Sequence, residues 1–257
     1  MIQFIRSFWG DLDRFSHRDE ILNSSRTISL NETVYVWGEE NNQFITSLGY
    51  NTKLMSVNPT EYGNHFYYDS NEFMIHKLIA IKMGVADYGE VIFLDWDCKQ
   101  VKEVDENFYN LIKEQDSKIQ MPLYSYPKNY SDLVIDEWKD IPNETRLYVL
   151  RQQEYLKKHH YDWNNEFVTP NAGFIYCSST SIIDELIRLN KELKIMIASE
   201  EMSFVEYTKM FCTNLEDYIK RFEPLVCDAK FETHFNQKDL NKFITQIIKK
   251  DLYFIHE

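Results

Sequence analysis

The apolar run Val91-Ile-Phe-Leu94 limits the possible folds of this chain more than any other feature of its sequence. A continuous apolar run of this length is typical of a strand that is covered on both faces, as in a parallel sheet. Parallel strands need crossover connections, which are usually helices. The run therefore predicts an α/β sandwich in which helices flank a mostly parallel central sheet.

Strand patterns and amphipathic helix patterns alternate through the rest of the chain, in agreement with this prediction. Further strands are expected at residues 2–9, 34–37, 53–57, 172–177 and 252–255. Helices are expected at residues 39–48, 69–83, 104–112, 144–160, 182–193, 202–215 and 237–250. Gly84 and Gly89 are expected to bracket a turn before the apolar run. No linker interrupts the alternation, so residues 1–257 are expected to form one domain.

The composition supplies a sizeable core and excludes two classes of partner. Hydrophobic residues make up 44% of the chain and aromatic residues 15%, which excludes disorder for most of it. The chain has 28 Lys and Arg residues against 41 Asp and Glu residues, so its net charge is −13. Nucleic acids and anionic membranes are bound through clustered positive charge. Neither is therefore expected as a partner.

Cysteines and apolar segments place the chain in a reducing compartment. The cysteines at positions 98, 177, 212 and 227 form no C-x-x-C pair, so neither a zinc ribbon nor a disulfide framework is expected. No apolar run approaches the ~20 residues of a membrane-spanning helix. Arg6 interrupts the first apolar stretch, which therefore lacks the pattern of a signal peptide. A cytoplasmic protein with reduced thiols is expected.

The apolar run leads directly into Asp95-Trp96-Asp97. In an extended segment, residues at i and i+2 point to the same side, so the two carboxylates can share one hard divalent cation. Mg²⁺ or Mn²⁺ completes its shell with water and with phosphate oxygens of a substrate, so the pair predicts stabilisation of a diphosphate. A D-x-D pair also arises by chance in so acidic a chain, and Asp11-Leu-Asp13 is a second copy. Its position after a clean apolar strand distinguishes the Asp95 copy.

Four segments follow one another in an order that matches a known superfamily. They are His76-Lys-Leu-Ile-Ala-Ile-Lys82, Val91-Ile-Phe-Leu-Asp-Trp-Asp97, Asn171-Ala-Gly-Phe-Ile-Tyr176 and Tyr253-Phe-Ile-His256. With them the chain resembles the GT-A-fold glycosyltransferases, in which a buried helix with a basic residue precedes a strand ending in D-x-D. An N-A-G-F strand and a histidine near the C-terminus follow in that superfamily. The resemblance implies a single-domain, Rossmann-like GT-A sandwich that moves a sugar from a nucleotide-diphosphate donor.

The resemblance also implies a metal site. Asp95, Asp97 and His256 would ligate Mn²⁺ or Mg²⁺, and Asp95 would in addition reach the ribose of the donor. An imidazole ligand favours Mn²⁺ over Mg²⁺. The other interpretation of His256 is an exposed residue beside the last residue of the chain.

The donor would contact residues from two further segments. Lys77 would pair with its phosphates as a point charge, although a solvated helix lysine is the plainer interpretation. Asn171, Ala172 and Gly173 would lie along the donor sugar, where glycine lets the backbone approach closely. The alternative for this segment is a turn that opens a strand after Pro170.

Aromatic and acidic residues complete the implied site. Phe8 and Trp9, at the end of the first strand, and Trp96 would flank the nucleotide base, unless they belong to the core. Glu200 and Glu201 stand where the superfamily often has an acidic residue near the acceptor, and Glu201 is the preferred catalytic base. A glutamate pair is also favourable at a helix N-terminus through the helix dipole alone. An inverting enzyme needs such a base and a retaining enzyme does not, so both stereochemical courses stay open.

Three other functions compete with this interpretation. A HAD-type phosphohydrolase would use Asp95 as nucleophile, but Lys99 stands where its motif has Thr or Val, and no G-D-x-x-x-D follows. A nucleotidyltransferase would need a glycine-rich loop after the first strand, where Gly10 stands alone. A non-catalytic sugar-binding or nucleotide-binding module would suit the aromatic, acidic composition, but would not need Asp95, Asp97 and His256 together.

The sequence thus predicts a divalent-metal-dependent glycosyltransferase of the hexosyltransferase type. Its donor is expected to be a UDP-sugar and its acceptor a hydroxyl group, most simply on a glycan. These expectations follow from the resemblance, and the order of the four segments carries them.

Overall fold

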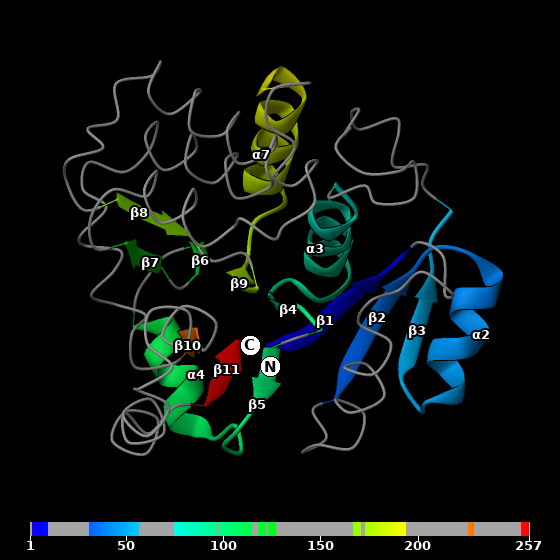
Figure 1. Cartoon of the computed structure of the whole chain (residues 1–257), viewed down its shortest axis with the longest axis horizontal. Helices are drawn as coiled ribbons and strands as arrows, with labels where there is room; N and C mark the ends of the chain where they lie inside the picture. Colours follow the sequence, from blue (N-terminus) through cyan, green and yellow to red (C-terminus); the bar gives the residue numbers. More distant parts are fainter. Residues whose placement is uncertain are drawn as a thin grey trace, which may run out of the picture.

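The computed structural model describes residues 2–9, 31–56, 75–96, 98–114, 118–121, 123–126, 167–170, 173–193, 226–228 and 253–256. These residues form a mixed α/β structure built on a six-stranded sheet with the strand order β3-β2-β1-β4-β9-β6 (Figure 1). Its strands are β1 (Gln3–Phe8), β2 (Glu32–Val36), β3 (Asn51–Leu54), β4 (Val91–Leu94), β9 (Phe174–Cys177) and β6 (Ile119–Gln120). The predicted α/β class is confirmed.

The main sheet is mostly parallel, as expected. Strands β3, β2, β1 and β4 pair in parallel, whereas β9 runs antiparallel to both β4 and β6. Two smaller sheets accompany it. One contains β10 (Val226–Asp228), β11 (Phe254–His256) and β5 (Cys98–Gln100), and the other contains β7 (Leu123–Tyr126) and β8 (Phe167–Pro170).

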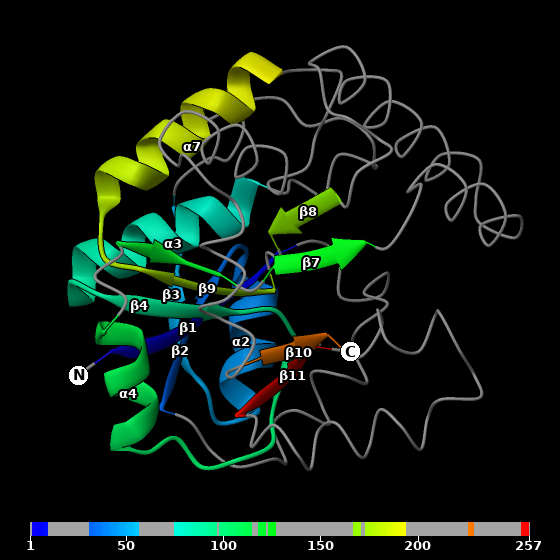
Figure 2. The ribbon, with the colours of Figure 1, turned by 90° about the vertical axis from the view of Figure 1, so that its left-hand side faces the viewer.

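Helices cover both faces of the main sheet. The described helices are α2 (Glu39–Ser47), α3 (Ile75–Tyr88), α4 (Glu106–Lys113) and α7 (Thr180–Leu193). Figure 2 shows α3 and α7 on one side of the sheet and α4 on the other. None of the four is both long and apolar enough to cross a membrane.

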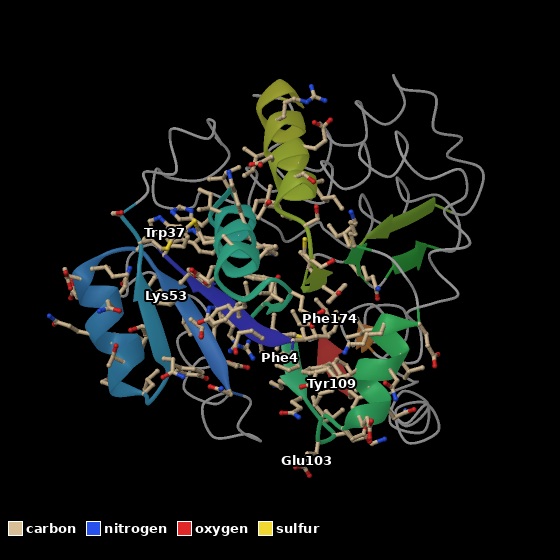
Figure 3. The ribbon with its side chains drawn as sticks, turned by 180° about the vertical axis from the view of Figure 1, so that it is seen from behind. Phe4, Trp37, Lys53, Glu103, Tyr109 and Phe174 are labelled. Carbon is tan, nitrogen blue, oxygen red and sulfur yellow. The ribbon has the colours of Figure 1, made fainter. Side chains whose placement is uncertain are left out.

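Residue alternation along the strands divides the core between the two faces. Ile5, Phe93 and Ile175 point towards α3 and α7, in one cluster of buried side chains. Phe4 and Phe174 point to the opposite face, where they pack with residues of α4 and β11 (Figure 3). The strand β4 is therefore buried on both faces, as its continuous apolar run predicts.

An aromatic cluster fastens the C-terminal strand to the main sheet. The rings of Phe4 and Phe254 lie 6.0 Å apart, those of Phe174 and Phe254 5.4 Å apart, and those of Phe108 and Tyr253 5.0 Å apart. All five rings are buried. Aromatic pairs of this geometry contribute beyond their buried area, so the cluster holds β11 beside the beginning of β1.

Most expected elements in the described part of the chain are present, with one clear error. The turn expected at Gly84 is wrong, because α3 continues through Gly84 to Tyr88. Gly89, at φ 83°, ends the helix in the left-handed conformation, and its N–H donates to the carbonyl of Val85 at 2.8 Å. Strand β3 also begins two residues earlier than expected. The helices expected at 144–160, 202–215 and 237–250 lie outside the described residues.

The glycine at position 84 allows α3 to approach the sheet closely. A Cβ atom there would lie 2.7 Å from Cδ1 of Ile5 and 3.1 Å from Cγ1 of Val91. Overpacking of a well-filled core typically costs about 1–3 kcal/mol.

We expect Gly84→Ala to lower the free energy of unfolding by about 1–3 kcal/mol, measured by urea denaturation. Because Cδ1 of Ile5 is the nearest atom, Ile5→Val should cost less in the Gly84→Ala background than in the wild type. Strictly additive costs of the two substitutions would show that the Ile5 contact is not the cause.

A polar cluster connects the C-terminal end of α3 to β2 and β3. Asp87 accepts hydrogen bonds from the Tyr35 hydroxyl at 2.5 Å and from the Lys53 ammonium at 2.7 Å. Desolvation alone would raise the pKa of Asp87, but these two hydrogen bonds outweigh it and hold the pKa below its ordinary value of 3.8. Burial, followed by the bond to Asp87, raises the pKa of Tyr35.

Because the pKa of Asp87 is lower in the folded protein than in the unfolded chain, the free energy of unfolding depends on pH in the acidic range. The contribution of Asp87 is fully present above pH 3.8 and is lost as the pH falls through the lower folded-state pKa. We therefore expect the free energy of unfolding to fall less on acidification from pH ~5 to pH ~2.5 in Asp87→Asn than in the wild type. Urea denaturation across this range measures the difference. An equal loss of unfolding free energy on acidification in the wild type and in Asp87→Asn would contradict this expectation.

Candidate functional site

The candidate site lies at the point in the main sheet where the order of the strands reverses, between β1 and β4. From β1 the chain adds β2 and β3 on one side, and then returns to add β4 on the other side of β1. In open α/β sheets, ligands bind beyond the carboxyl ends of the strands at such a switch point. Trp9 follows the end of β1 and Asp95 follows the end of β4. Both predicted residues therefore lie at the switch point.

Lys77 and Asp95 form an ion pair across this edge. Nζ of Lys77, in the first described turn of α3, lies 2.8 Å from Oδ2 of Asp95. The Lys77 side chain is 7% exposed and that of Asp95 is 30% exposed. The structure thus brings together two residues that are 18 positions apart, and Lys77 is not the solvated surface lysine of the plainer interpretation.

Backbone hydrogen bonds fix the segment that follows β4. The N–H of Asp95 donates to the carbonyl of Gly173 at 2.8 Å, and the N–H of Cys98 donates to the carbonyl of Asp95 at 3.0 Å. Nε1 of Trp96 donates to the carbonyl of Ser7 at 2.9 Å. Asp95 is therefore held by its side chain, its N–H and its carbonyl, and Gly173 lies directly beside it.

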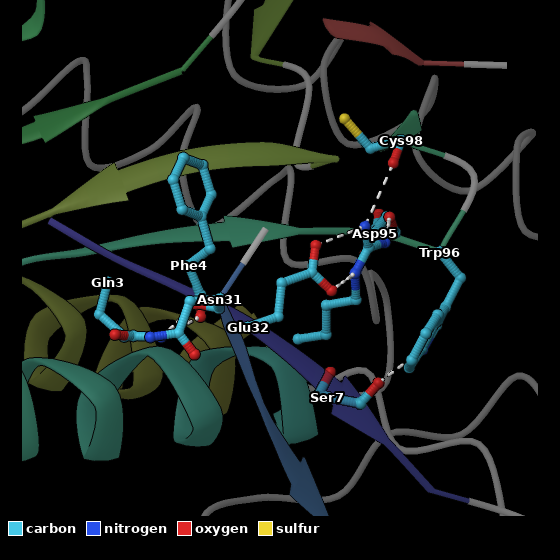
Figure 4. Close-up of polar contacts among 9 residues, drawn as sticks. Gln3, Phe4, Ser7, Asn31, Glu32, Asp95, Trp96 and Cys98 are labelled. Carbon is cyan, nitrogen blue, oxygen red and sulfur yellow. Dashed lines mark hydrogen bonds and ion pairs between the residues drawn. The ribbon is translucent and has the colours of Figure 1, made fainter. Parts of the chain in front are cut away.

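Arg6 contacts the same segment from the face of the sheet that carries Phe4, opposite to the face of Ile5 and α3. Figure 4 shows Glu32, Asp95 and Cys98 among the residues that take part in these polar contacts. Its Nη1 donates to the carbonyl of Asp95 at 2.5 Å and its Nη2 to the carbonyl of Cys98 at 3.4 Å. Nε and Nη2 also donate to the two carboxylate oxygens of Glu32, at 2.8 and 3.0 Å. Burial by itself lowers the pKa of Arg6, but the Glu32 carboxylate outweighs this effect and the pKa is raised. Arg6 is therefore a permanent, buried cation.

Aromatic rings gather at the carboxyl ends of β1 and β2. The ring of Trp9 stacks on that of His76 at 4.8 Å, with an interplanar angle of 2°. The ring of Trp37 meets His76 edge-on at 4.6 Å. Phe8 and Trp96, by contrast, are 1% and 7% exposed and pack in a core cluster. Of the three aromatics predicted to flank a base, Trp9 is thus the least buried.

Strand β11 brings the backbone of His256 beside Cys98. Strand β11 pairs with β5 so that His256 stands opposite Cys98, and β10 places Asp228 on the other side of His256. The hydroxyl of Tyr253 donates to Asp105, at the start of α4, at 2.8 Å. The backbone of β11 therefore lies beside Cys98, the residue that follows Asp97 in the sequence.

Several predicted site residues fall outside the described part of the chain. They are Asp97, Asn171, Ala172, Glu200 and Glu201, and only the backbone of His256 is described. Within the described residues, no group of three or more His, Cys, Asp or Glu side chains could hold a metal ion. The roles of these residues stay predictions.

Sequence reasoning missed the buried pair of Arg6 and Glu32, and also Trp37 and His76. A signal for Arg6 is present, because strand alternation puts it on the same face as the buried residues Phe4 and Phe8. A charged residue at an inward position needs a partner, and Glu32 opens the next strand.

Comparisons with known proteins relate the chain to others only through structure. No protein-family model matches it, and no curated protein matches it. Mouse xyloside xylosyltransferase 1 in its apo form is similar with a TM-score of 0.48 and 8% identity, covering 100% of this chain and 97% of the other. The mannosyltransferase Ktr4p from S. cerevisiae is similar with a TM-score of 0.41 and 11% identity, covering 78% and 62%. The glycosyltransferase GlyE of Streptococcus pneumoniae TIGR4 is similar with a TM-score of 0.39 and 11% identity, covering 100% and 55%. The function of this chain is therefore inferred below from its own residues.

The Lys77–Asp95 ion pair is expected to contribute to the free energy of unfolding. Asp95→Asn keeps the shape of the side chain but removes the negative charge beside a buried ammonium, so we expect a loss of about 1–3 kcal/mol of unfolding free energy. Lys77→Met in the Asp95→Asn background should recover part of this loss. Urea denaturation in metal-free buffer gives the coupling energy as a double-mutant cycle. A coupling of zero would mean that the pair contributes nothing to the folded state.

Proposed function

We propose that this protein is a glycosyltransferase that transfers a sugar from a nucleotide-diphosphate donor, a UDP-sugar, to a hydroxyl group of a glycan acceptor. The observation that carries the proposal is the Lys77–Asp95 ion pair at the carboxyl end of β4. A buried lysine and a half-buried carboxylate at a switch point suit a ligand that carries phosphate groups.

The residues around the pair support a donor site of this kind. Trp9 follows the end of β1 and stacks on His76, the residue before Lys77 in sequence, so an aromatic ring stands at the edge of the sheet where a nucleobase would bind. Gly173 contacts the backbone of Asp95 and has no side chain to block the approach of a sugar. The acidic Asp95 carboxylate is an acceptor suited to ribose or sugar hydroxyl groups.

The types of the predicted ligands, two carboxylates and an imidazole, suit a divalent metal ion. Asp95 is accessible to solvent and supplies a carboxylate oxygen, and the register of β11 brings the His256 backbone beside Cys98. With Asp97, these residues would hold Mn²⁺ or Mg²⁺, and the imidazole would favour Mn²⁺. A bound metal ion would supply positive charge that stabilises the departing diphosphate.

The side chains of the protein would carry out the other steps of the transfer. Lys77 would neutralise negative charge that develops on the leaving diphosphate. The acceptor hydroxyl would attack the anomeric carbon as the bond from that carbon to the diphosphate breaks. For an inverting course, Glu201 or Glu200 would accept the proton of the hydroxyl.

Calorimetric titration of UDP into metal-stripped protein, with and without Mn²⁺, tests the proposal. We expect UDP to bind only with Mn²⁺, and Asp97→Ala to weaken this binding by about 10–100-fold, since one charge-assisted contact is worth about 1.5–3 kcal/mol. Asp97→Ala should also abolish donor turnover while the protein stays folded.

The second D-x-D copy in the chain supplies a matched control, because Asp13→Ala removes a carboxylate of the same spacing and should leave UDP binding unchanged. Equal UDP binding by wild type and Asp97→Ala would reject the donor site. Sugar or nucleotide binding without turnover would favour a binding module, and Mg²⁺-dependent phosphate release would favour a phosphohydrolase.

A further inference from the structure

Arg6 occupies a position where a charged side chain is costly. It lies between Phe4 and Phe8 on the inward face of β1 and is 4% exposed. Its partner Glu32 is 7% exposed. Replacing such a pair with apolar residues is often neutral or stabilising. Stability alone therefore gives no reason for a buried arginine in this strand.

The contacts of Arg6 point to another role. Among the described residues, the guanidinium donates four hydrogen bonds, and two of them go to Glu32. The other two go to the backbone carbonyls of Asp95 and Cys98, which stand at either end of the segment that contains Asp97. The planar guanidinium presents its donors in a rigid fork, so it sets the separation of these two carbonyls.

The side chain of Trp96, which lies between Asp95 and Cys98 in the sequence, also contacts β1. The indole of Trp96 lies over the Arg6 guanidinium, with Cζ 5.0 Å from the ring centroid, and its Nε1 donates to the carbonyl of Ser7. Residues 6 and 7 of β1 thus hold Asp95, Trp96 and Cys98. Lys77 holds the Asp95 carboxylate from the α3 side.

We propose that Arg6, oriented by Glu32, is a positioning residue that fixes the backbone at Asp95 and Cys98, on either side of the predicted ligand Asp97. The inference rests on the proposed function, because this backbone needs a fixed position only if the D-x-D carboxylates bind a metal ion and a donor. Neighbours that orient metal ligands are typically worth 10–100-fold in metal affinity. Arg6 and Glu32 would act at this level without touching the metal ion or the donor.

The double substitution of Arg6→Met with Glu32→Leu separates positioning from stability. It replaces the ion pair with apolar side chains of similar size, so the urea midpoint should stay close to that of the wild type. The carbonyls of Asp95 and Cys98 lose their guanidinium donors, so Mn²⁺ affinity should fall by about 10–100-fold. Mn²⁺ alone is titrated into metal-stripped protein, with free Mn²⁺ measured by electron paramagnetic resonance. Hydrogen exchange at the Cys98 amide, which donates to Asp95, reports the segment directly and should become faster.

Two further variants complete the test. Leu186→Ala on α7 lowers the urea midpoint through a cavity in the core and should leave Mn²⁺ affinity unchanged. Arg6→Lys keeps the charge but not the fork, and should also weaken Mn²⁺ binding, so it replaces the double variant if that variant does not fold.

The outcomes distinguish the two claims. The inference is supported if the wild type and Leu186→Ala bind Mn²⁺ with the same affinity and the Arg6 variants bind it more weakly. Binding within about twofold of the wild type in folded Arg6 variants overturns it and leaves the proposed function standing. Folded wild-type protein that binds no Mn²⁺ rejects the proposed metal site, and the positioning role fails with it.

Discussion

The burial of β4 on both faces is the constraint on which the rest of the structure depends. A strand between two apolar layers can carry a charged side chain only if that charge has a buried partner, because an unpaired buried charge costs several kcal/mol. The four residues of β4 are all apolar. Asp95 is therefore the first position at which β4 can present a carboxylate, and the N–H of Asp95 still bonds to the backbone of Gly173. The carboxylate remains only 30% exposed, so Lys77 compensates it from α3. The packing of the core thus determines where the candidate site lies.

The sequence predicts those parts of the fold and site that depend on local periodicity. The apolar run of β4, the buried helix that carries Lys77 and the extended segment before His256 could all be identified in this way. Gly84 was misinterpreted because its place inside α3 depends on the distance between that helix and Ile5, which no local pattern encodes. Strands β5 and β10 have three residues each, too few to show a period of two. The pairing of Arg6 with Glu32 joins positions 26 apart and becomes visible only when β1 and β2 are adjacent.

Charge at the candidate site runs against the charge of the chain as a whole. The net charge is −13, yet the end of β4 is bordered by two buried cations, Arg6 and Lys77. Low local polarity strengthens the effect of these charges relative to the screened charges on the surface. Each cation already has a carboxylate partner, Glu32 for Arg6 and Asp95 for Lys77, so the folded protein tolerates them before any ligand is present.

The two ion pairs differ in how readily they could exchange partners. Arg6 is bidentate to a carboxylate that is itself buried, and it also bonds to two backbone carbonyls, so leaving Glu32 would strand a buried negative charge. Lys77 is a compact point charge on a flexible stem, and its partner Asp95 is accessible to water. An incoming diphosphate could therefore compete for Lys77 at little structural cost, since the Asp95 carboxylate would then be solvated or bound to a cation. Under the proposed function, Arg6 organises the backbone of the site, while Lys77 is the cation that the substrate can engage.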